Sequence, residues 1–289
     1  MDLPKRKKKK FENIITLYGR KPVLESLKDE SVQIFRLHLS DSNKEGETIS
    51  ETLRIAELRG VEVVTHSRTE LSRISKNSRQ DQGVAVDIEP KKYEHINDYN
   101  PTTSDLLVAD HITNPQNLGM IIRSVVASPM SGILVPKKGC ASIDALVHKA
   151  SAGTLLKGNI FFCETIDSGL ENLKSKGFSI FGLASDATKE LGSLTAETKK
   201  QAFVLGNESN GLSAQAKKFC DELIKIKLHN EVDSINVAAA ATLALAALAL
   251  ACLAQWSSRR PGTRASSAMN CLRALAKVSC GSWTSAVAP

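Results

Sequence analysis

The chain has 289 residues, of which 42% are hydrophobic and 24% are charged. This length holds about two domains and a sizeable core, and the composition is that of a globular protein, which excludes a disordered or fibrous chain. The formal net charge of +7 is unevenly placed, because residues 1–10 carry six basic residues and one acid, and residues 255–289 carry five basic residues and no acid. The body between these ends is therefore not a polycation.

Residues 1–13 are expected to form a basic, disordered arm. Its run "KRKKKK" predicts either an arm that binds RNA phosphates or a solvated terminus. No apolar segment follows this run, so it is not a secretory signal peptide. The six cysteines form no CxxC pair and no metal-binding spacing with the six histidines, which indicates reduced thiols, a cytoplasmic protein and no metal site.

Helix and strand patterns alternate between residues 14 and 90, and this alternation predicts a small α/β domain. The expected elements are, in order, a helix over 19–27, a strand over 32–39, a helix over 47–59, a strand over 61–66, a helix over 68–75 and a strand over 83–88. The segment 91–104 has neither period and is rich in turn residues, so we interpret it as a linker.

A second alternation of strands and helices covers residues 105–254 and predicts a mostly parallel sheet with helices on both faces. Its expected strands cover 105–112, 132–136, 158–164, 178–185, 202–206 and 223–228. Its expected helices begin near 118, 142, 167, 212 and 237. The remaining residues, 255–289, change to Ser, Arg and Ala with weak periodicity, which predicts an atypical and mostly disordered tail.

The helix expected at 237–254 contains eighteen residues without a charge, about the length of a bilayer crossing. Ten of the eighteen are Ala and five are Leu. Since Ala is only weakly hydrophobic, membrane insertion of this helix would be marginal. A parallel sheet covered by helices can bury such a segment within a protein. We therefore expect a helix packed on the protein body, and no membrane span.

Polar clusters follow the strand ends, where open α/β sheets bind ligands. Asn117 is placed to cap the helix after the first strand, and Arg123 would lie in the second turn of that helix. Taken alone, this pair indicates an N-cap and a solvated arginine. In the second cluster, Gly206 and Glu208 follow a strand and Gly211 opens a helix. A phosphate-binding loop is disfavoured there, since no GxGxxG or GxxxxGK[ST] motif is present and a carboxylate would repel phosphate.

The third cluster, "HNEVDSINV", lies before the apolar helix. Its local interpretation is an ordinary helix start, with Ser234 or Asp233 as the N-cap. The three clusters together, in this order and at these spacings, are far more specific than any one of them.

This combination resembles the SpoU (TrmH-type) family of RNA 2′-O-ribose methyltransferases. The family motifs read approximately N-x-G-x-x-x-R, G-N-E-G-x-G-L and I-P-M-(x)-S-L-N-V-S. Here they stand as "NLGMIIR" at 117–123, "GNESNGL" at 206–212, and "IKL" at 226–228 followed by "SINV" at 234–237. The segments "LYGRKPVLESL", "QGVAV" and "HKASAG" also match. The resemblance covers about residues 16–252 and favours the two-domain members that methylate guanosine in bacterial 23S ribosomal RNA.

The resemblance implies a trefoil-knotted (SPOUT) parallel-sheet catalytic domain, preceded by a small ribosomal-protein-like RNA-binding domain. It implies a homodimer that uses S-adenosyl-L-methionine to methylate a ribose 2′-hydroxyl of 23S ribosomal RNA. Two alternatives are a transfer RNA 2′-O-methyltransferase and a non-catalytic RNA-binding ribosome-assembly factor. An oxidoreductase that binds a dinucleotide is disfavoured because its glycine fingerprint is absent.

The resemblance also assigns site residues. Those expected to bind the cofactor are Gly206, Asn207, Ile226, Leu228 and Ile235. Those expected to form the reaction site are Asn117, Arg123, Glu208, Ser234 and Asn236. Because a guanidinium stays protonated in proteins, we expect Arg123 to donate hydrogen bonds to the RNA rather than act as a base. Lys227 and Ser209 depart from the family's usual Pro and Gly, and Ile235 replaces its usual Leu.

Overall fold

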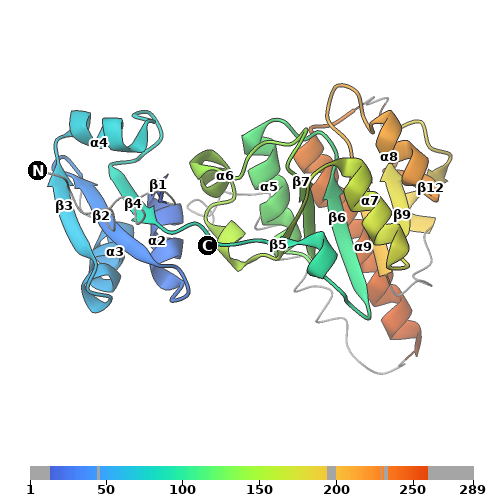
Figure 1. Ribbon diagram of the computed structural model, residues 1–289, viewed down its shortest axis with the longest axis horizontal. Helices are drawn as coiled ribbons and strands as arrows, with labels where there is room; N and C mark the ends of the chain where they lie inside the picture. The colour runs from blue at the N-terminus through green and yellow to red at the C-terminus, as the bar shows by residue number, and fades with distance from the viewer. Residues whose placement is uncertain (1–13, 44–45, 194–199, 229, 231–233, 260–289) are drawn as a thin grey trace, which may run out of the picture. The chain divides into compact units, whose positions relative to one another are not determined.

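The described part of the chain forms two compact units (Figure 1). The computed structural model describes residues 14–43, 46–193, 200–228, 230 and 234–259. The first unit comprises residues 14–92 and 143–156, and the second comprises residues 93–142 and 157–259. The sequence assigns 143–156 to the second domain, while by its contacts this segment groups with the first unit. The predicted domain boundaries stay a prediction. The basic arm and the tail beyond 259 lie outside the described residues.

The first unit is built on a four-stranded sheet in the order β1-β4-β2-β3. Strand β4 is antiparallel to β1 and β2, and β2 is parallel to β3. The strands are β1 (Ile15–Tyr18), β2 (Ile34–Ser40), β3 (Glu62–His66) and β4 (Val84–Ile88). The helices are α2 (Arg20–Lys28), α3 (Glu47–Leu58), α4 (Arg68–Ser75) and α6 (Ala145–Ala150), with a 3-10 helix at Thr154–Lys157. The sequence did not predict the short strand β1.

The core of the first unit forms where alternate strand residues face its helices. Leu37 and Val86 are fully buried and pack in one cluster with Val23 of α2. Leu156, from the second segment of this unit, belongs to the same cluster and is 2% exposed. Removing these apolar side chains from water is the main term that stabilises the unit.

The second unit is built on an eight-stranded sheet in the order β10-β12-β9-β11-β6-β7-β8-β5, and every neighbouring pair is parallel. Its strands are β5 (Glu94–His95), β6 (Ser104–Ala109), β7 (Gly132–Pro136), β8 (Ile160–Cys163), β9 (Ser179–Leu183), β10 (Lys189–Glu190), β11 (Lys200–Leu205) and β12 (Glu222–Lys225). Its helices are α5 (Pro115–Val126), α7 (Ile166–Ser175), α8 (Ala214–Phe219) and α9 (Val237–Arg259), with 3-10 helices at Ile96–Asp98 and Leu191–Ser193. The predicted fold class, two α/β parts with a parallel catalytic sheet, is confirmed.

Alternate residues of the central strand β6 serve the two faces of this sheet, because successive side chains of a strand point in opposite directions. Leu106 and Val108 pack in one cluster with Leu170 of α7 and Ala216 of α8. Helices α5 and α9 pack against each other, and Figure 1 shows α9 behind the strands and α7 in front of them. Helices therefore cover both faces of the sheet.

Helix α9 contains the apolar segment. Its inner face, which includes Ala241 and Leu245, is buried, and Thr242 Oγ1 lies 2.8 Å from Ser124 Oγ of α5. Leu243 and Leu250 remain 49% and 45% exposed. The chain thus buries one face of a helix that is apolar all round and leaves the other face open. Among the described residues, no helix has the combined length and hydropathy required to cross a membrane.

The expected trefoil knot concerns the loops at 206–211 and 226–236. Both loops lie near the carboxyl ends of β11 and β12, and residues from both line one cavity. Residues 229 and 231–233 of the second loop are outside the described residues, and the knot stays a prediction.

Candidate active site

The first polar cluster lies at the start of α5. Asn114, not Asn117, caps this helix, because its side-chain oxygen accepts hydrogen bonds from the backbone N–H groups of Gln116 and Asn117. Pro115 occupies the first helical position, where its missing N–H costs nothing. The predicted cap at Asn117 is therefore wrong by one turn. Arg123 accordingly lies in the third turn rather than the second.

The second cluster forms a tight loop after β11. The backbones of Asn207 and Gly211 exchange two hydrogen bonds, of 3.2 and 3.1 Å. The Asn207 side chain accepts further bonds from the backbone N–H groups of Ser209 and Asn210. Gly206 packs so tightly that an added Cβ would lie 2.2 Å from the Gly211 carbonyl, and Gly211 has a φ of +63°. Both glycines are thus needed for the shape of this loop.

A chain of hydrogen bonds between side chains joins the three clusters. The Asn117 amide donates to Glu208 Oε1, and Asn117 Oδ1 accepts a bond of 3.2 Å from the Asn236 amide. Asn117 is only 5% exposed, so its amide is held between these two partners. The three residues come from segments that are 91 and 119 positions apart in the sequence. The fold thus brings three of the five predicted reaction-site residues into one connected group.

Asn236 has a second role at the start of α9. Its Oδ1 accepts hydrogen bonds from the backbone N–H groups of Ala238 and Ala239, at 2.9 and 3.4 Å. Asn236 is therefore the N-cap of α9, and the expectation of Ser234 for this position is wrong. Asp233, the other expected cap, lies outside the described residues. Capping fixes the orientation of Asn236, because its oxygen binds the helix while its amide points to Asn117.

A cavity of about 460 Å³ opens beside this group, at the carboxyl ends of β9, β11 and β12. All five residues expected to bind the cofactor line it: Gly206, Asn207, Ile226, Leu228 and Ile235. Two residues of the expected reaction site, Glu208 and Ser234, line it as well. Its volume is in the range of cavities that enclose ligands of nucleoside size.

Some residues of the cavity wall were not predicted from the sequence. Ser185 and Asp186 line it directly after β9. Their position could have predicted this, since polar residues at the carboxyl end of a parallel strand often bind ligands. Asp110 was missed as well. It is fully buried after β6, and its carboxylate accepts hydrogen bonds from Ser213 N and from His111, both at 2.6 Å, so it ties the end of β6 to the start of α8.

Arg123 stands apart from the connected group. It is half-buried on α5 and does not line the cavity, and its guanidinium has no hydrogen bond or ion pair with another described residue. It follows Met120 by three positions, so both side chains lie on one face of α5. Met120 is 40% exposed. The guanidinium is therefore available to a partner outside the single chain.

Two partly buried cysteines of the second unit, Cys140 and Cys220, have thiols with a raised pKa. Burial raises the pKa of Cys140 to about 11 and that of Cys220 to about 11. Both therefore stay protonated at neutral pH, whereas the thiolate is the reactive form. Neither thiol lines the cavity, whose side chains include amide, carboxylate and hydroxyl groups.

Comparisons with known proteins agree with this geometry. The profile of the SpoU rRNA Methylase family matches residues 105–246, and the profile for RNA 2′-O ribose methyltransferase substrate binding matches residues 16–94. A protein of Mycobacterium leprae (strain TN), named an uncharacterized tRNA/rRNA methyltransferase, is 33% identical over 251 residues, which cover 85% of this chain and 80% of that protein. The chain belongs to the SpoU family. It is an RNA 2′-O-ribose methyltransferase with a substrate-binding domain at its N-terminal side.

Two solved SpoU-type structures share the fold. The methyltransferase AviRb of Streptomyces viridochromogenes, in complex with AdoMet, has a TM-score of 0.69 at 21% identity and covers 88% of this chain and 95% of its own. The AdoMet-bound rRNA methyltransferase of Sinorhizobium meliloti has a TM-score of 0.66 at 19% identity, with 84% and 89% covered. At these identities the likeness concerns the fold.

Both unusual residues of this SpoU chain fit its loops. Ser209 replaces a glycine, and its φ is not positive, so no glycine is required there. Lys227 replaces a proline; its ammonium lies 3.1 Å from Glu190 Oε1, while its neighbours Ile226 and Leu228 line the cavity. Ser209 itself lines the cavity, whereas Lys227 does not.

Proposed function

We propose that this SpoU enzyme binds S-adenosylmethionine in the 460 Å³ cavity and methylates a ribose 2′-hydroxyl of bacterial 23S ribosomal RNA. The observation that carries the proposal is the hydrogen-bonded group of Asn117, Glu208 and Asn236 at the rim of that cavity. It joins all three family motifs beside a space lined by every residue expected to hold the cofactor.

The cavity fits the cofactor in chemistry as well as in volume. Ile226, Leu228 and Ile235 offer an apolar surface to an adenine ring, and Gly206 lines the cavity without a side chain. Asp186 and Glu208 bring two negative charges to the wall against one positive charge from Lys217, and this balance suits a ligand with a cationic sulfur. When bound, S-adenosylmethionine supplies a methyl group on a positively charged sulfur.

The chain's own residues position the RNA. Arg123 donates hydrogen bonds to the 2′-oxygen and to a neighbouring phosphate, and so stabilises negative charge that develops on the oxygen. Asn117 holds the Glu208 carboxylate at the cavity rim, and Asn236 holds Asn117. Positioning of this kind is the main contribution that an enzyme makes to a transfer between two bound groups.

The presence of a substrate-binding unit beside the catalytic unit supports a large, structured RNA as the substrate. The first unit matches a substrate-binding profile, and the family is described by its action on rRNA. Within 23S ribosomal RNA we propose a guanosine as the target, as in the two-domain members that the sequence resembles. A transfer RNA substrate is the second candidate, since the Mycobacterium leprae relative is named for both RNAs.

The test is methyl transfer from labelled S-adenosylmethionine to purified 23S ribosomal RNA, 16S ribosomal RNA and transfer RNA. We expect label in 23S RNA alone, in 2′-O-methylguanosine after nuclease digestion and mass spectrometry. Glu208→Ala, which removes the carboxylate from the connected group, serves as the inactive control. Label in transfer RNA only would replace the proposed substrate. Cofactor binding without transfer to any RNA would favour the non-catalytic assembly factor.

We further propose that the enzyme is a homodimer, with a second copy packed on α5 and α9. Met120, Leu243 and Leu250 are large apolar side chains exposed on these two helices. Arg123 lies on the same face of α5 as Met120, so a partner packed there would lie beside its guanidinium. The arginine and the cavity would then meet at the interface between copies.

Leu243→Glu is expected to convert the dimer to a monomer, because it places a charge in an apolar interface. Sedimentation equilibrium of the full chain measures the mass directly. Leu58→Glu is the matched control, since Leu58 is 75% exposed in the first unit and should leave the dimer unchanged. A dimeric Leu243→Glu protein, or a monomeric unmodified chain, would contradict the proposed interface.

A further inference from the structure

A second cavity, of about 340 Å³, lies in the first unit and is lined by polar and charged residues. Its residues are Arg20, Ser42, Asn43, Arg68 and Gln82. They meet because β1, β2 and β3 run in one direction and β4 runs against them. The residues that follow the first three strands and those that precede the fourth are thereby gathered at one edge of the sheet.

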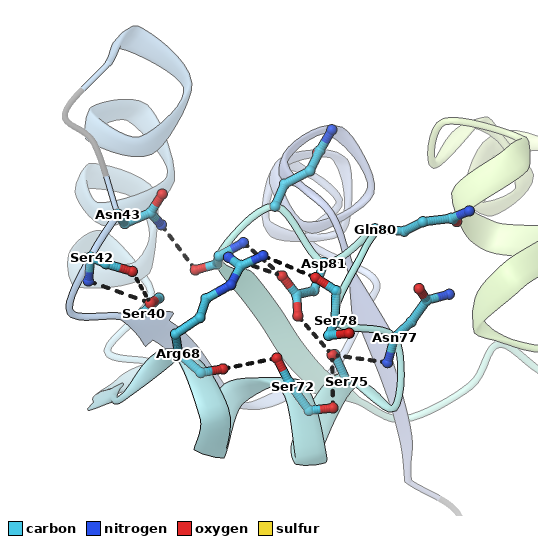
Figure 2. A network of polar contacts seen from close by, with 12 residues as sticks. Ser40, Ser42, Asn43, Arg68, Ser72, Ser75, Asn77, Ser78, Gln80 and Asp81 are labelled. Atoms are coloured by element: carbon cyan, nitrogen blue, oxygen red, sulfur yellow. Dashed lines mark hydrogen bonds and ion pairs between the residues drawn. The ribbon is translucent and has the colours of Figure 1, made fainter.

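Arg68 is held in place by a buried acid. Its Nη1 lies 3.4 Å from Asp81 Oδ1, and its Nη2 donates a 2.9 Å hydrogen bond to the Ser78 carbonyl (Figure 2). Asp81 is fully buried and also accepts hydrogen bonds from Ser75 Oγ and Gly83 N, both at 3.0 Å. The guanidinium is therefore fixed before any ligand arrives, while the Arg68 side chain stays 49% exposed.

Arg20 is oriented from the other side of the cavity. Its Nη2 donates to Asn43 Oδ1 at 3.1 Å, and its backbone N–H donates to Gln82 Oε1 at 2.9 Å. Asn43 is itself fixed by a 2.9 Å bond from its amide to the Gly83 carbonyl. Among the described residues, no carboxylate forms an ion pair with Arg20. Within the described part of the unit, no carboxylate therefore neutralises its charge.

We infer that this cavity binds a phosphate of the RNA backbone. Each guanidinium presents five N–H donors, and the bonds above use only some of them, so both can bind one phosphodiester. The hydroxyl of Ser42, which lies 2.8 Å from Ser40 Oγ, also lines the wall. Phosphate contacts of this kind set the register of an RNA without reading its sequence. The inference rests on the proposed function, because it supplies that RNA substrate with a fixed anchor away from the reaction site.

The test compares variants of the full chain in binding labelled 23S ribosomal RNA at several salt concentrations. Arg20→Gln and Arg68→Gln are each expected to weaken binding about tenfold and to reduce the salt dependence, with a slope smaller by about one when both are changed. Gln82→Glu leaves the Arg68 anchor intact, keeps an acceptor for the Arg20 N–H and adds a repelling charge, so it should weaken binding similarly. Arg54→Gln is the control, since exposed Arg54 pairs with Glu51 outside the cavity.

The possible results distinguish failure of the phosphate site from failure of the proposed methyltransferase function. Weakened RNA binding in the three cavity variants, with unchanged cofactor affinity, supports the inference. Equal RNA binding by the cavity variants and Arg54→Gln overturns it, even if the enzyme methylates RNA. Thermal stabilisation by inorganic phosphate that is lost in Arg20→Gln, together with unchanged RNA affinity, also overturns it in favour of a free-phosphate site. An unmodified chain that binds no RNA would overturn the proposed function itself.

Discussion

Replacing Arg123 with alanine is expected to reduce the rate of methyl transfer by about a thousandfold, the loss typical when a donor to a developing negative charge is removed. Cofactor affinity should stay nearly unchanged, because Arg123 does not line the 460 Å³ cavity. The measurements are the single-turnover rate with 23S ribosomal RNA and the calorimetric dissociation constant of S-adenosylmethionine.

The control for this experiment is Arg123→Lys. A lysine keeps the positive charge but loses the planar fork that can bind a phosphate and a 2′-oxygen together. We expect it to recover only part of the lost rate. An Arg123→Ala enzyme as active as the unmodified one would show that Arg123 has no part in the reaction. A large loss of cofactor affinity would instead place Arg123 at the cofactor.

Replacing Gly206 with alanine is expected to weaken cofactor binding by about a hundredfold or more. The added Cβ would lie 2.2 Å from the Gly211 carbonyl and 2.4 Å from Leu212 N, both of which are backbone groups that cannot turn away. The loop from Asn207 to Gly211 would have to open, and the cavity wall would move with it. Calorimetric titration with S-adenosylmethionine measures the effect.

Gly192→Ala is the matched control, because nothing lies within 4 Å of a Cβ added there. It makes the same chemical change in the same unit and should leave cofactor affinity unaltered. Thermal unfolding of both variants shows whether the second unit still folds. A folded Gly206→Ala protein with normal affinity would mean that the cofactor does not depend on this loop.

Local signals predicted many elements closely. Helix α4 was expected over 68–75 and is found there, because Ser67 and Glu70 form a capping box that marks its start. Strand β7 was likewise expected over 132–136 and has those bounds. Strand β1 was missed because it has only four residues and depends on its pairing with β4, which is distant in sequence. The cap of α5 was misplaced because two asparagines lie near its start and only Asn114 precedes the proline.

The candidate site could be predicted less completely. The five residues that the motifs predicted for cofactor binding all line the cavity. The motifs could not predict the hydrogen bonds from Asn117 to Glu208 and from Asn236 to Asn117, because these depend on how segments distant in the sequence meet. The polar cavity of the first unit could not be predicted from the sequence. Arg20 and Gln82 lie in segments that match the family, but nothing in the sequence indicates that they share a cavity with Arg68, and only the sheet topology brings them to one edge.

The segment 143–156 makes the substrate-binding unit discontinuous in the sequence. Its Leu156 completes the core of that unit, and the Lys91 ammonium donates a 3.0 Å hydrogen bond to the Leu156 carbonyl. The chain therefore leaves the unit after residue 92 and returns to it fifty residues later. A fragment that ends at residue 92 would lack Leu156 from its core, so we expect it to be less stable than the same unit within the full chain.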